Sequence, residues 1–418
     1  MTQTPSRRIA QRAWALSAWA NHAFATSVLV VFFPIYFNSY WAKGLPGTTS
    51  TAYLGFANSG ASLAVMLLAP WLGILADRRG QKKLWFGVFT VLGALATLAL
   101  AWIGRGLWQA ALPVFALASV GYFAGSSFQD ALLVRVADAQ ETNRISAYGF
   151  AAGYLGGGLL LLVNVLMALH PAWFGLADAG VATRVVFADV ALWWILFSLP
   201  LFRRVTEAPP TAEGSSLGEL WATIRHILAD RVVRTFLFAY WLYIDAISTL
   251  QLMAVDFGVK LHFSTPSLTI AVLLVQFISF PFALLFGRLG DRIGARRAIY
   301  LGLAVFVFVT VWAFFMQHEW QFYLLAALVG TAQGGVQALS RSYFARLIPR
   351  ERAGEYFGFY NMLGKFAAVL GPMVMGVTAI ATGSQRLSIL VLAVLFIVGA
   401  WLLARVPASA DAAAQARA

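Results

Sequence analysis

The chain has 418 residues, is strongly apolar and carries few charges. Sixty per cent of its residues are hydrophobic and 11% are charged, with a mean hydropathy of +0.75, whereas soluble domains hold roughly 25% charged residues. This composition excludes an ordinary soluble domain. The absence of cysteine also excludes disulfides, thiolate metal sites and cysteine nucleophiles. We therefore expect an all-α integral membrane protein.

Apolar runs of about 20 residues, the length that crosses a bilayer, recur along the chain. They predict twelve transmembrane helices, at 16–37, 53–76, 84–103, 108–135, 145–168, 184–202, 234–257, 267–289, 298–317, 320–344, 356–380 and 386–405. The polar stretch EAPPTAEGSSLGE follows the sixth of them and is typical of a flexible linker. The predicted organisation is an N-terminal six-helix bundle at 1–202, a cytoplasmic linker at 203–233, a C-terminal six-helix bundle at 234–405 and a cytoplasmic tail at 406–418.

The basic residues predict how the chain is oriented. A formal charge of +13 is found in many proteins that bind nucleic acid, but here the positive charges gather at the termini, in the linker and in the even-numbered loops. Positive loops stay in the cytoplasm, so both termini are expected there. The exceptions are Lys43, Arg105, Arg184, Lys260 and Arg386 in the opposite loops, and Lys365 inside a span. We expect no nucleic-acid partner and at most a minor attraction to anionic lipid. Short loops and a preference for Arg over Lys favour a bacterial inner membrane.

A charged motif occurs twice. GILADRRGQKK at Gly73–Lys83 returns as GRLGDRIGARR at Gly287–Arg297, and both fit G-x-x-x-D-R-x-G-x-(K/R)-(K/R). Each copy follows the second predicted helix of its half. Internal symmetry between membrane halves is the sequence signature of secondary transporters, whose substrate site lies near the midplane between the halves.

This motif and the six-plus-six plan resemble the major facilitator superfamily. Other segments are similar to its vacuole-effluxer-like branch, and these are Ser17–Phe37, the GYLGGGLLLL run from Gly153, Trp193–Phe202, Gly334–Pro349 and Phe357–Pro372. The resemblance implies two pseudo-symmetric six-helix halves that transport a solute by alternating access. Fungal members of the branch are implicated in releasing amino acids from the vacuole.

The motif residues are expected to control gating. Glycine permits tight turns and close backbone approach, and a carboxylate at a helix end can face the positive end of a neighbouring helix. The resemblance implies that such contacts latch the halves on the cytoplasmic side, with Asp130 as the expected partner of Arg78. The predicted gating set is Gly73, Asp77, Arg78, Gly80, Lys83, Asp130, Gly287, Asp291, Arg292, Gly294 and Arg297, in which Asp291 and Arg292 form the second latch. A solvated charge cluster without a switching role is the alternative.

Two ionisable residues are predicted inside the bilayer, where charge is costly and usually functional. Asp245 lies eleven residues after Arg234, roughly 16 Å deep, and Lys365 lies at a similar depth. We expect them to face one cavity, where they pair or contact a zwitterionic solute; a permanent structural salt bridge is the alternative. Neutral side chains that could complete this substrate or proton pathway are Trp19, Asn21, His22, Gln251, Gln333, Gln337, Tyr360 and Asn361, although helix packing alone explains many such residues.

The predicted function is secondary transport of a small amino-acid-like or amphiphilic solute, as efflux, with proton coupling as an option through Asp245. No phosphate-binding loop, HExxH or GxSxG motif is present, so we expect neither an ATP-driven pump nor a hydrolase. No cofactor or metal is expected, and the protein is expected to act as a monomer. Two alternatives stay open: a transporter-like receptor or lipid scramblase without solute flux, and a membrane-embedded enzyme that transfers lipid-linked groups.

Overall fold

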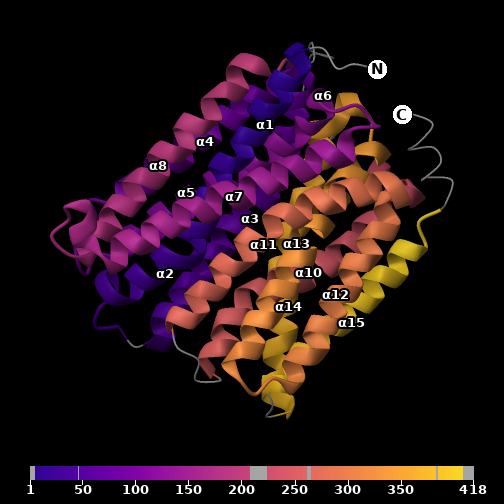
Figure 1. The fold of residues 1–418 in the computed structure, drawn as a ribbon. Helices are drawn as coiled ribbons and strands as arrows, with labels where there is room; N and C mark the ends of the chain where they lie inside the picture. The colour runs from indigo at the N-terminus through magenta and orange to yellow at the C-terminus, as the bar shows by residue number, and fades with distance from the viewer. Residues whose placement is uncertain (1–4, 46, 208–223, 261–264, 383–384, 408–418) are drawn as a thin grey trace.

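A computed structural model describes residues 5–45, 47–207, 224–260, 265–382 and 385–407. Throughout these residues the regular structure is helical. Figure 1 shows two groups of helices side by side, one from each half of the sequence, with the start of α1 and the end of α15 at the same end of the bundle. We call this the terminal end and the other the far end. Most of the predicted linker, 208–223, and most of the tail lie outside the described residues.

The N-terminal group is built from long helices joined by short loops. Its helices are α1 (Pro5–Ala23), α3 (Gly47–Arg79), α4 (Lys82–Leu100), α5 (Trp108–Ala131), the short α6 (Leu133–Val136), α7 (Thr142–Leu169) and α8 (Ala179–Arg204). Within the group α1 packs against α7 and α8, and α4 packs against α5 and α8. These bounds agree with the first six predicted spans to within a few residues, except that the first helix begins earlier.

The C-terminal group has the same plan. Its helices are α10 (Arg231–Lys260), α11 (Thr265–Ile293), α12 (Ala295–Phe315), α13 (Glu319–Leu347), α14 (Ala353–Thr382) and α15 (Gln385–Ala404). Among the described residues, nine helices are long and apolar enough to cross a membrane, and a bent pair within α3, Gly60–Ala69 and Trp71–Arg79, would make a tenth. The figure of twelve spans stays a prediction, because α10 and α14 are not among these candidates.

The helix that begins at α1 changes its winding halfway along. A π-helical segment at Phe24–Phe32 follows α1, then the short α2 (Phe33–Tyr36) and a second π-helical segment at Phe37–Trp41. Thr26 Oγ1 donates to the carbonyl oxygen of His22 at 2.9 Å, which is the acceptor that the Thr26 amide would use in an α-helix. Pro34 in α2 has no amide hydrogen to donate and disfavours regular α-helix before it. π-Helical turns are frequent at functional sites.

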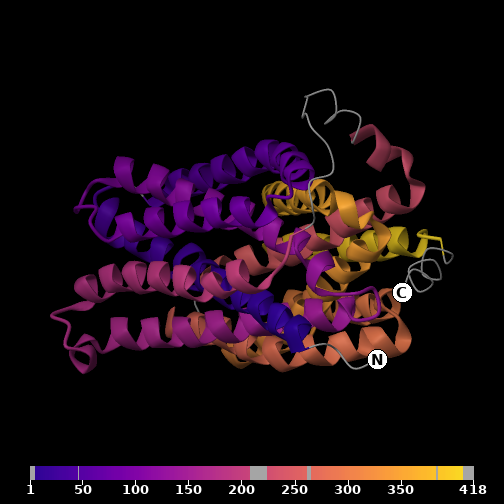
Figure 2. The ribbon, with the colours of Figure 1, turned by 90° about the horizontal axis from the view of Figure 1, so that it is seen from above.

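The two groups touch mainly through four helix pairs: α3 with α14, α7 with α11, α7 with α13, and α5 with α14. At the terminal end a hydrophobic core joins both groups, with Trp14 and Phe128 from one and Phe236 and Phe344 from the other. A second core, around Trp194, is formed by buried side chains of the N-terminal group. Figures 1 and 2 show the groups in contact at the terminal end, and in Figure 1 they spread apart toward the far end.

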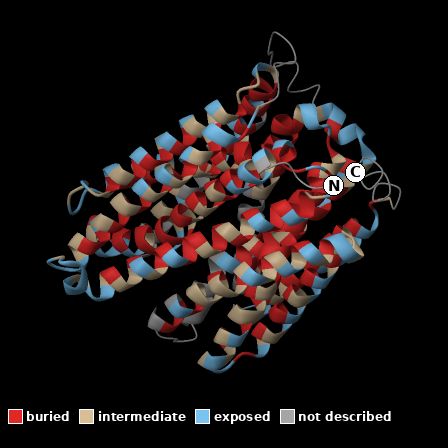
Figure 3. Ribbon diagram, turned by 45° about the horizontal axis from the view of Figure 1, so that its top comes forward, coloured by how far each residue is buried: buried red, intermediate tan, exposed pale blue. Residues whose placement is uncertain are grey.

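The outer faces of the helices are apolar. Figure 3 shows buried residues along the inner faces and exposed residues along the outside of the bundle. Large hydrophobic side chains are among the exposed ones, such as Leu95 at 55%, Leu192 at 67% and Ile397 at 55%. A surface of this kind is suited to lipid, while the backbone polar groups are satisfied within the helices.

The first glycine of each motif copy lies where the two groups touch. A Cβ added to Gly73 of α3 would overlap the carbonyl group of Gly354 in α14, and one added to Gly287 of α11 would lie 2.5 Å from Cβ of Ala147 in α7. The glycines that end the same helices, Gly80 and Gly294, have φ angles of 61° and 88°, a region that glycine enters at little cost. The sequence repeat is therefore also a repeat of backbone geometry.

We expect alanine at two glycines of α3 to change stability in opposite directions. Gly73→Ala should lower the free energy of unfolding by about 1–3 kcal/mol, the usual cost of overpacking, because its Cβ would collide with backbone at Gly354. Gly60→Ala is the matched control, since nothing lies within 4 Å of its added Cβ, and helix propensity alone should stabilise it by up to about 1 kcal/mol. Thermal unfolding in detergent tests both, and equal shifts would contradict the close approach.

Candidate functional site

Asp77, at the end of α3, caps the first turn of α14 in the other group. Its carboxylate accepts hydrogen bonds from the backbone N–H groups of Gly354, at 3.0 Å, and Glu355, at 2.7 Å. Lys82 is almost fully buried and forms an ion pair with the same carboxylate. The expected contact between this aspartate and the positive end of a neighbouring helix is present. The basic residue paired with Asp77 is Lys82 from the start of α4.

The second motif copy makes a weaker contact. Asp291, at the end of α11, is exposed and accepts a hydrogen bond from Asn143 Nδ2 of α7 at 3.0 Å. The carbonyl oxygen of the Asn143 amide accepts in turn from Ser342 Oγ of α13, at 2.7 Å. Arg292, expected with Asp291 in the second latch, forms no ion pair with Asp291 among the described residues. The second contact is thus a hydrogen-bond chain rather than the predicted charge latch.

Among the remaining motif cations, Lys83 and Arg297 lie away from the contact between the groups. Lys83 donates its backbone N–H to Glu207 and its ammonium to the carbonyl oxygen of Phe202, both at the end of the N-terminal group. Arg297 is exposed at the start of α12. Arg78 directly follows Asp77 in the last turn of α3, so its charge lies near the Asp77 contact.

A buried arginine connects the groups at a position that the sequence reasoning treated only as a loop charge. Arg341 of α13 donates to Asp130 Oδ1 of α5 at 2.7 Å, with side chains 6% and 14% exposed. It also donates to Ser146 of α7 twice, to the hydroxyl at 2.9 Å and to the carbonyl oxygen at 2.8 Å. The predicted Asp130–Arg78 pair is therefore wrong, because Asp130 is occupied by Arg341 and by Asn361 Nδ2 at 3.3 Å.

The surroundings of Arg341 explain how its charge is held inside the bundle. Its guanidinium lies over the rings of Trp14 and Phe150, 4.9 and 4.3 Å from their centroids, an arrangement that stabilises a cation. Asp130 neutralises it and the Ser146 oxygens accept its other N–H groups. The sequence held a signal for this buried charge. Arg341 lies six residues before the end of α13, roughly 9 Å inside the helix, where a loop charge would not be expected.

Ion pairs at the rim of the terminal end add to this contact. Asp138, between α6 and α7, pairs with Arg7 of α1 and lies 3.7 Å from Arg350 of the C-terminal group. The hydrogen bond from Arg7 holds the pKa of Asp138 below its ordinary value, and the charge of Arg350 acts in the same direction. Asp138 therefore stays ionised at neutral pH.

Three predicted pathway residues meet around Tyr154 of α7, near the middle of the bundle. Gln333 Nε2 of α13 donates to the Tyr154 hydroxyl at 3.1 Å, and that hydroxyl donates to Gln337 Oε1 at 3.3 Å. The ring of His22 packs against Tyr154 edge to face, with centroids 5.3 Å apart. We call Tyr154, Gln333, Gln337 and His22 the central cluster. Trp19, one turn before His22, packs beside it, at Gly156 of α7 and against Trp193 of α8.

Several polar atoms in and beside the central cluster are buried without a hydrogen-bond partner in the described structure. They are Trp19 Nε1 of α1, Gln333 Oε1 of α13, and Gln276 Nε2 of α11, whose side chain packs at Gly158 of α7. Buried polar groups are nearly always paired, so each exception needs a reason. These atoms come from both groups and lie on helices that pack against α7.

Other predicted pathway residues have different surroundings. Asn21 is fully engaged, as it accepts from Trp194 Nε1 and donates to Gln129 Oε1 inside the N-terminal group. Asn361 belongs to the Asp130–Arg341 contact, and Tyr360 stacks on Tyr240 with ring centroids 4.0 Å apart. Gln251 is exposed on α10. None of these four contacts Tyr154 through an interaction that the described residues show.

Asp245 of α10 is completely buried within the C-terminal group. Its Oδ1 accepts from the backbone N–H of Gly371 in α14 at 3.0 Å, whereas Oδ2 has no hydrogen-bond partner in the described structure. The structure does not describe the side chain of Lys365, so pairing between Asp245 and Lys365 stays a prediction. Asp189 of α8, which the sequence pattern did not single out, has a similar buried Oδ1 without a hydrogen-bond partner among the described residues. Among the described residues, no group of three acidic or histidine side chains could hold a metal ion.

We expect the Asp130–Arg341 pair to behave as a buried ion pair. Arg341→Met should cost about 3–5 kcal/mol of unfolding free energy, because it leaves Asp130 charged and unpaired. Adding Asp130→Asn should recover part of that loss, which a double-mutant cycle in denaturant would measure. Arg350→Gln is the control, since its pair with Asp138 is half-exposed and should cost less than about 1 kcal/mol. Strictly additive losses would contradict the pairing.

Comparison with known proteins places this architecture in a family. The family described as "Vacuole effluxer Atg22 like" matches residues 135–416. The chain is 35% identical over 404 residues to the uncharacterized MFS-type transporter YxiO of Bacillus subtilis (strain 168), covering 95% of this chain and 94% of that one. It is 26% identical over 296 residues to autophagy-related protein 22-2 of Emericella nidulans, covering 62% of this chain and half of the fungal protein.

Solved structures share the fold at low sequence identity. The proton:xylose symporter XylE superposes with a TM-score of 0.73 at 14% identity, over 96% of this chain and 95% of that one. The transporter FucP in its outward conformation also gives 0.73, at 12% identity, over 96% and 98% of the two chains. The chain is therefore a multi-pass membrane protein of the major facilitator fold, and it belongs to the vacuole effluxer Atg22-like family of transporters rather than to a class of enzymes.

Proposed function

We propose that the protein moves a small organic solute across the membrane by alternating access between its two helix groups. The observation that supports this most directly is where the polar contacts between the groups lie. The contacts of Asp77, Arg341 and Asn143 are near the terminal end, and the innermost bond described above, Tyr154 to Gln333, is near the middle. The cytoplasmic linker at 203–233 would join two halves, 1–202 and 234–405, that move as units.

The terminal end is proposed to face the cytoplasm. The basic residues concentrated there support this orientation through the positive-inside rule. In that orientation the two groups are in contact on the cytoplasmic side and spread apart toward the opposite side of the membrane. The central cluster lies between these two ends. Asp77, Lys82, Asp130 and Arg341 would then be the contacts that break when the protein opens inward. A bacterial inner membrane is the proposed location.

The proposed solute is amino-acid-like, and the proposed direction is efflux. The description of the family as a vacuole effluxer supports the direction. The unpaired donors Trp19 Nε1 and Gln276 Nε2 suit a carboxylate, and Gln333 Oε1 suits an ammonium group. Asp245, with one carboxylate oxygen buried and unpaired, is the proposed proton carrier, with Lys365 on α14 as a proposed second member of the pathway.

Flux from proteoliposomes tests the transport proposal. Amino acids, peptides and amphiphilic drugs that raise the melting temperature of the purified protein would be loaded and their flux followed with and without a pH gradient. We expect gradient-dependent flux that Asp245→Asn uncouples from pH. Asp178→Asn is the control, because Asp178 caps its own helix at the far end. Lipid mixing without solute flux would instead favour a scramblase, and normal pH-dependent flux in Asp245→Asn would remove that residue from the mechanism.

The contact of Asp77 predicts a change in accessibility. The chain has no cysteine, so a single Ala338→Cys on the buried inner face of α13 reports opening of the terminal end through its labelling rate. Asp77→Asn should increase that rate about tenfold or more, since it weakens two charge-assisted hydrogen bonds, each typically worth about 1.5–3 kcal/mol. Asp178→Asn should leave the rate unchanged. An unchanged rate in Asp77→Asn would show that the contact does not hold this end closed.

A further inference from the structure

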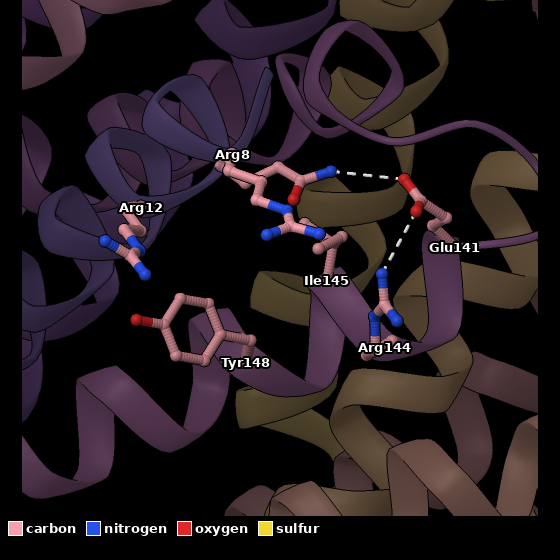
Figure 4. Close-up of a pocket in the computed structure, with 7 residues that line it drawn as sticks. Arg8, Arg12, Glu141, Arg144, Ile145 and Tyr148 are labelled. Carbon is pink, nitrogen blue, oxygen red and sulfur yellow. Dashed lines mark hydrogen bonds and ion pairs between the residues drawn. The ribbon is translucent and has the colours of Figure 1, made fainter. Parts of the chain in front are cut away.

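A basic pocket opens on the terminal end of the N-terminal group, outside the contacts that join the two groups. It has a volume of about 530 Å³ and lies between the first turns of α1 and of α7. Arg8, Gln11 and Arg12 line it from α1, with the i, i+3, i+4 spacing that places side chains on one helix face. Glu141, Arg144, Ile145 and Tyr148 line it from the other side. Figure 4 shows the hydroxyl of Tyr148 pointing toward Arg12 and the Arg8 guanidinium extending into the space between the helices.

The charges of this pocket are unevenly matched. Glu141 is its one acidic residue, and both carboxylate oxygens are engaged: Oε1 with Arg144 at 3.0 Å, and Oε2 with Gln11 at 3.2 Å and Arg7 at 3.6 Å. Arg8 and Arg12 are exposed and form no ion pair or hydrogen bond with any described residue. With three arginines and one glutamate, the lining has a net charge of +2, centred on the two unpaired guanidinium groups.

The chemistry of the lining favours a phosphate group. Arginine presents a planar fork of donors that matches phosphate oxygens in two-point contact, and two such forks one helical turn apart can hold one phosphate from two sides. Tyr148 adds a hydroxyl donor from the facing helix. The volume is larger than a bare ion needs, so it can hold a headgroup that carries the phosphate.

The position of the pocket places it at a membrane interface. Immediately after Arg12, α1 becomes apolar with Ala13, Trp14 and Ala15, so the arginines lie where the helix leaves the hydrocarbon region. Ile9, which follows Arg8 on α1, is 44% exposed, and Tyr148 of the pocket lining is 40% exposed. An exposed aliphatic side chain and a tyrosine beside arginines are typical of the headgroup level of a bilayer.

From this geometry we propose that the pocket formed by Arg8, Arg12, Arg144 and Tyr148 binds a phosphate-bearing anion, of the kind that an anionic phospholipid headgroup presents. The occupant would neutralise Arg8 and Arg12 and tie the start of α1 to the start of α7. The composition alone predicts only a diffuse attraction to anionic lipid, whereas the fold collects two of the charges into a defined site. This site does not depend on the transport proposal.

Lipid binding to the delipidated full-length protein tests the site. Native mass spectrometry would follow binding of phosphatidylglycerol, with phosphatidylcholine as the uncharged comparison. Arg8→Gln with Arg12→Gln should weaken phosphatidylglycerol binding by about thirtyfold, as expected when two interfacial arginines are lost. Arg203→Gln with Arg204→Gln is the matched control, because these two arginines are also exposed and at the terminal end. Unchanged circular dichroism would show that both variants are folded.

The competing outcomes separate the sources of the phosphate. A selective loss in the Arg8/Arg12 variant, insensitive to millimolar inorganic phosphate, supports a lipid site. If inorganic phosphate binds with the same dependence on Arg8 and Arg12 and displaces the lipid, the pocket is an anion site and the lipid assignment is overturned. Equal losses in the two double variants would show diffuse attraction only and would overturn the site itself.

Discussion

The cost of burying charge in a membrane protein governs the arrangement of this structure at its terminal end. Arg341 lies inside the bundle, where an unpaired guanidinium would be prohibitively expensive. Its partners are supplied by the other helix group: Asp130 and Ser146 accept its hydrogen bonds, and Trp14 and Phe150 cover its faces. Since these partners belong to different helices, the charge is satisfied only while α5, α7 and α13 are held together.

The two halves share the same backbone geometry at the repeated motif, but different hydrogen bonds hold the groups together there. Gly73 and Gly287 both allow a helix of the opposite group to approach closely, and Gly80 and Gly294 both turn the chain at the helix end. The fastenings differ because the neighbouring residues do: the first contact uses an aspartate on backbone amides, and the second a chain through Asn143 to Ser342. Opening the terminal end would therefore break two contacts of unequal strength, that of Asp77 and that of Asn143.

Much of the fold could be predicted from the sequence, because each helix is a long apolar run and each boundary carries a charge or a glycine. The repeated motif also located the contact of Asp77 with a helix start. The partners were harder to predict, since Asp130 could only be matched to a nearby charge, and the true partner, Arg341, is distant in sequence and had been counted with the loop cations. Tyr154 was missed for a related reason: a tyrosine in an aromatic-rich chain is unremarkable until Gln333 and Gln337 are seen beside it.

The contact of Asp77 with α14 has a consequence for studies that infer contacts from co-varying positions. Its hydrogen-bond donors are the backbone amides of Gly354 and Glu355, and every residue except proline supplies such an amide. Substituting side chains along the start of α14 would therefore leave the donors in place, and no compensating pair of substitutions would mark the contact. Only Gly354 would be constrained, because a Cβ there would lie 2.9 Å from Asp77 Oδ2. In an alignment this contact would leave a conserved aspartate and a conserved glycine, without covariation between them.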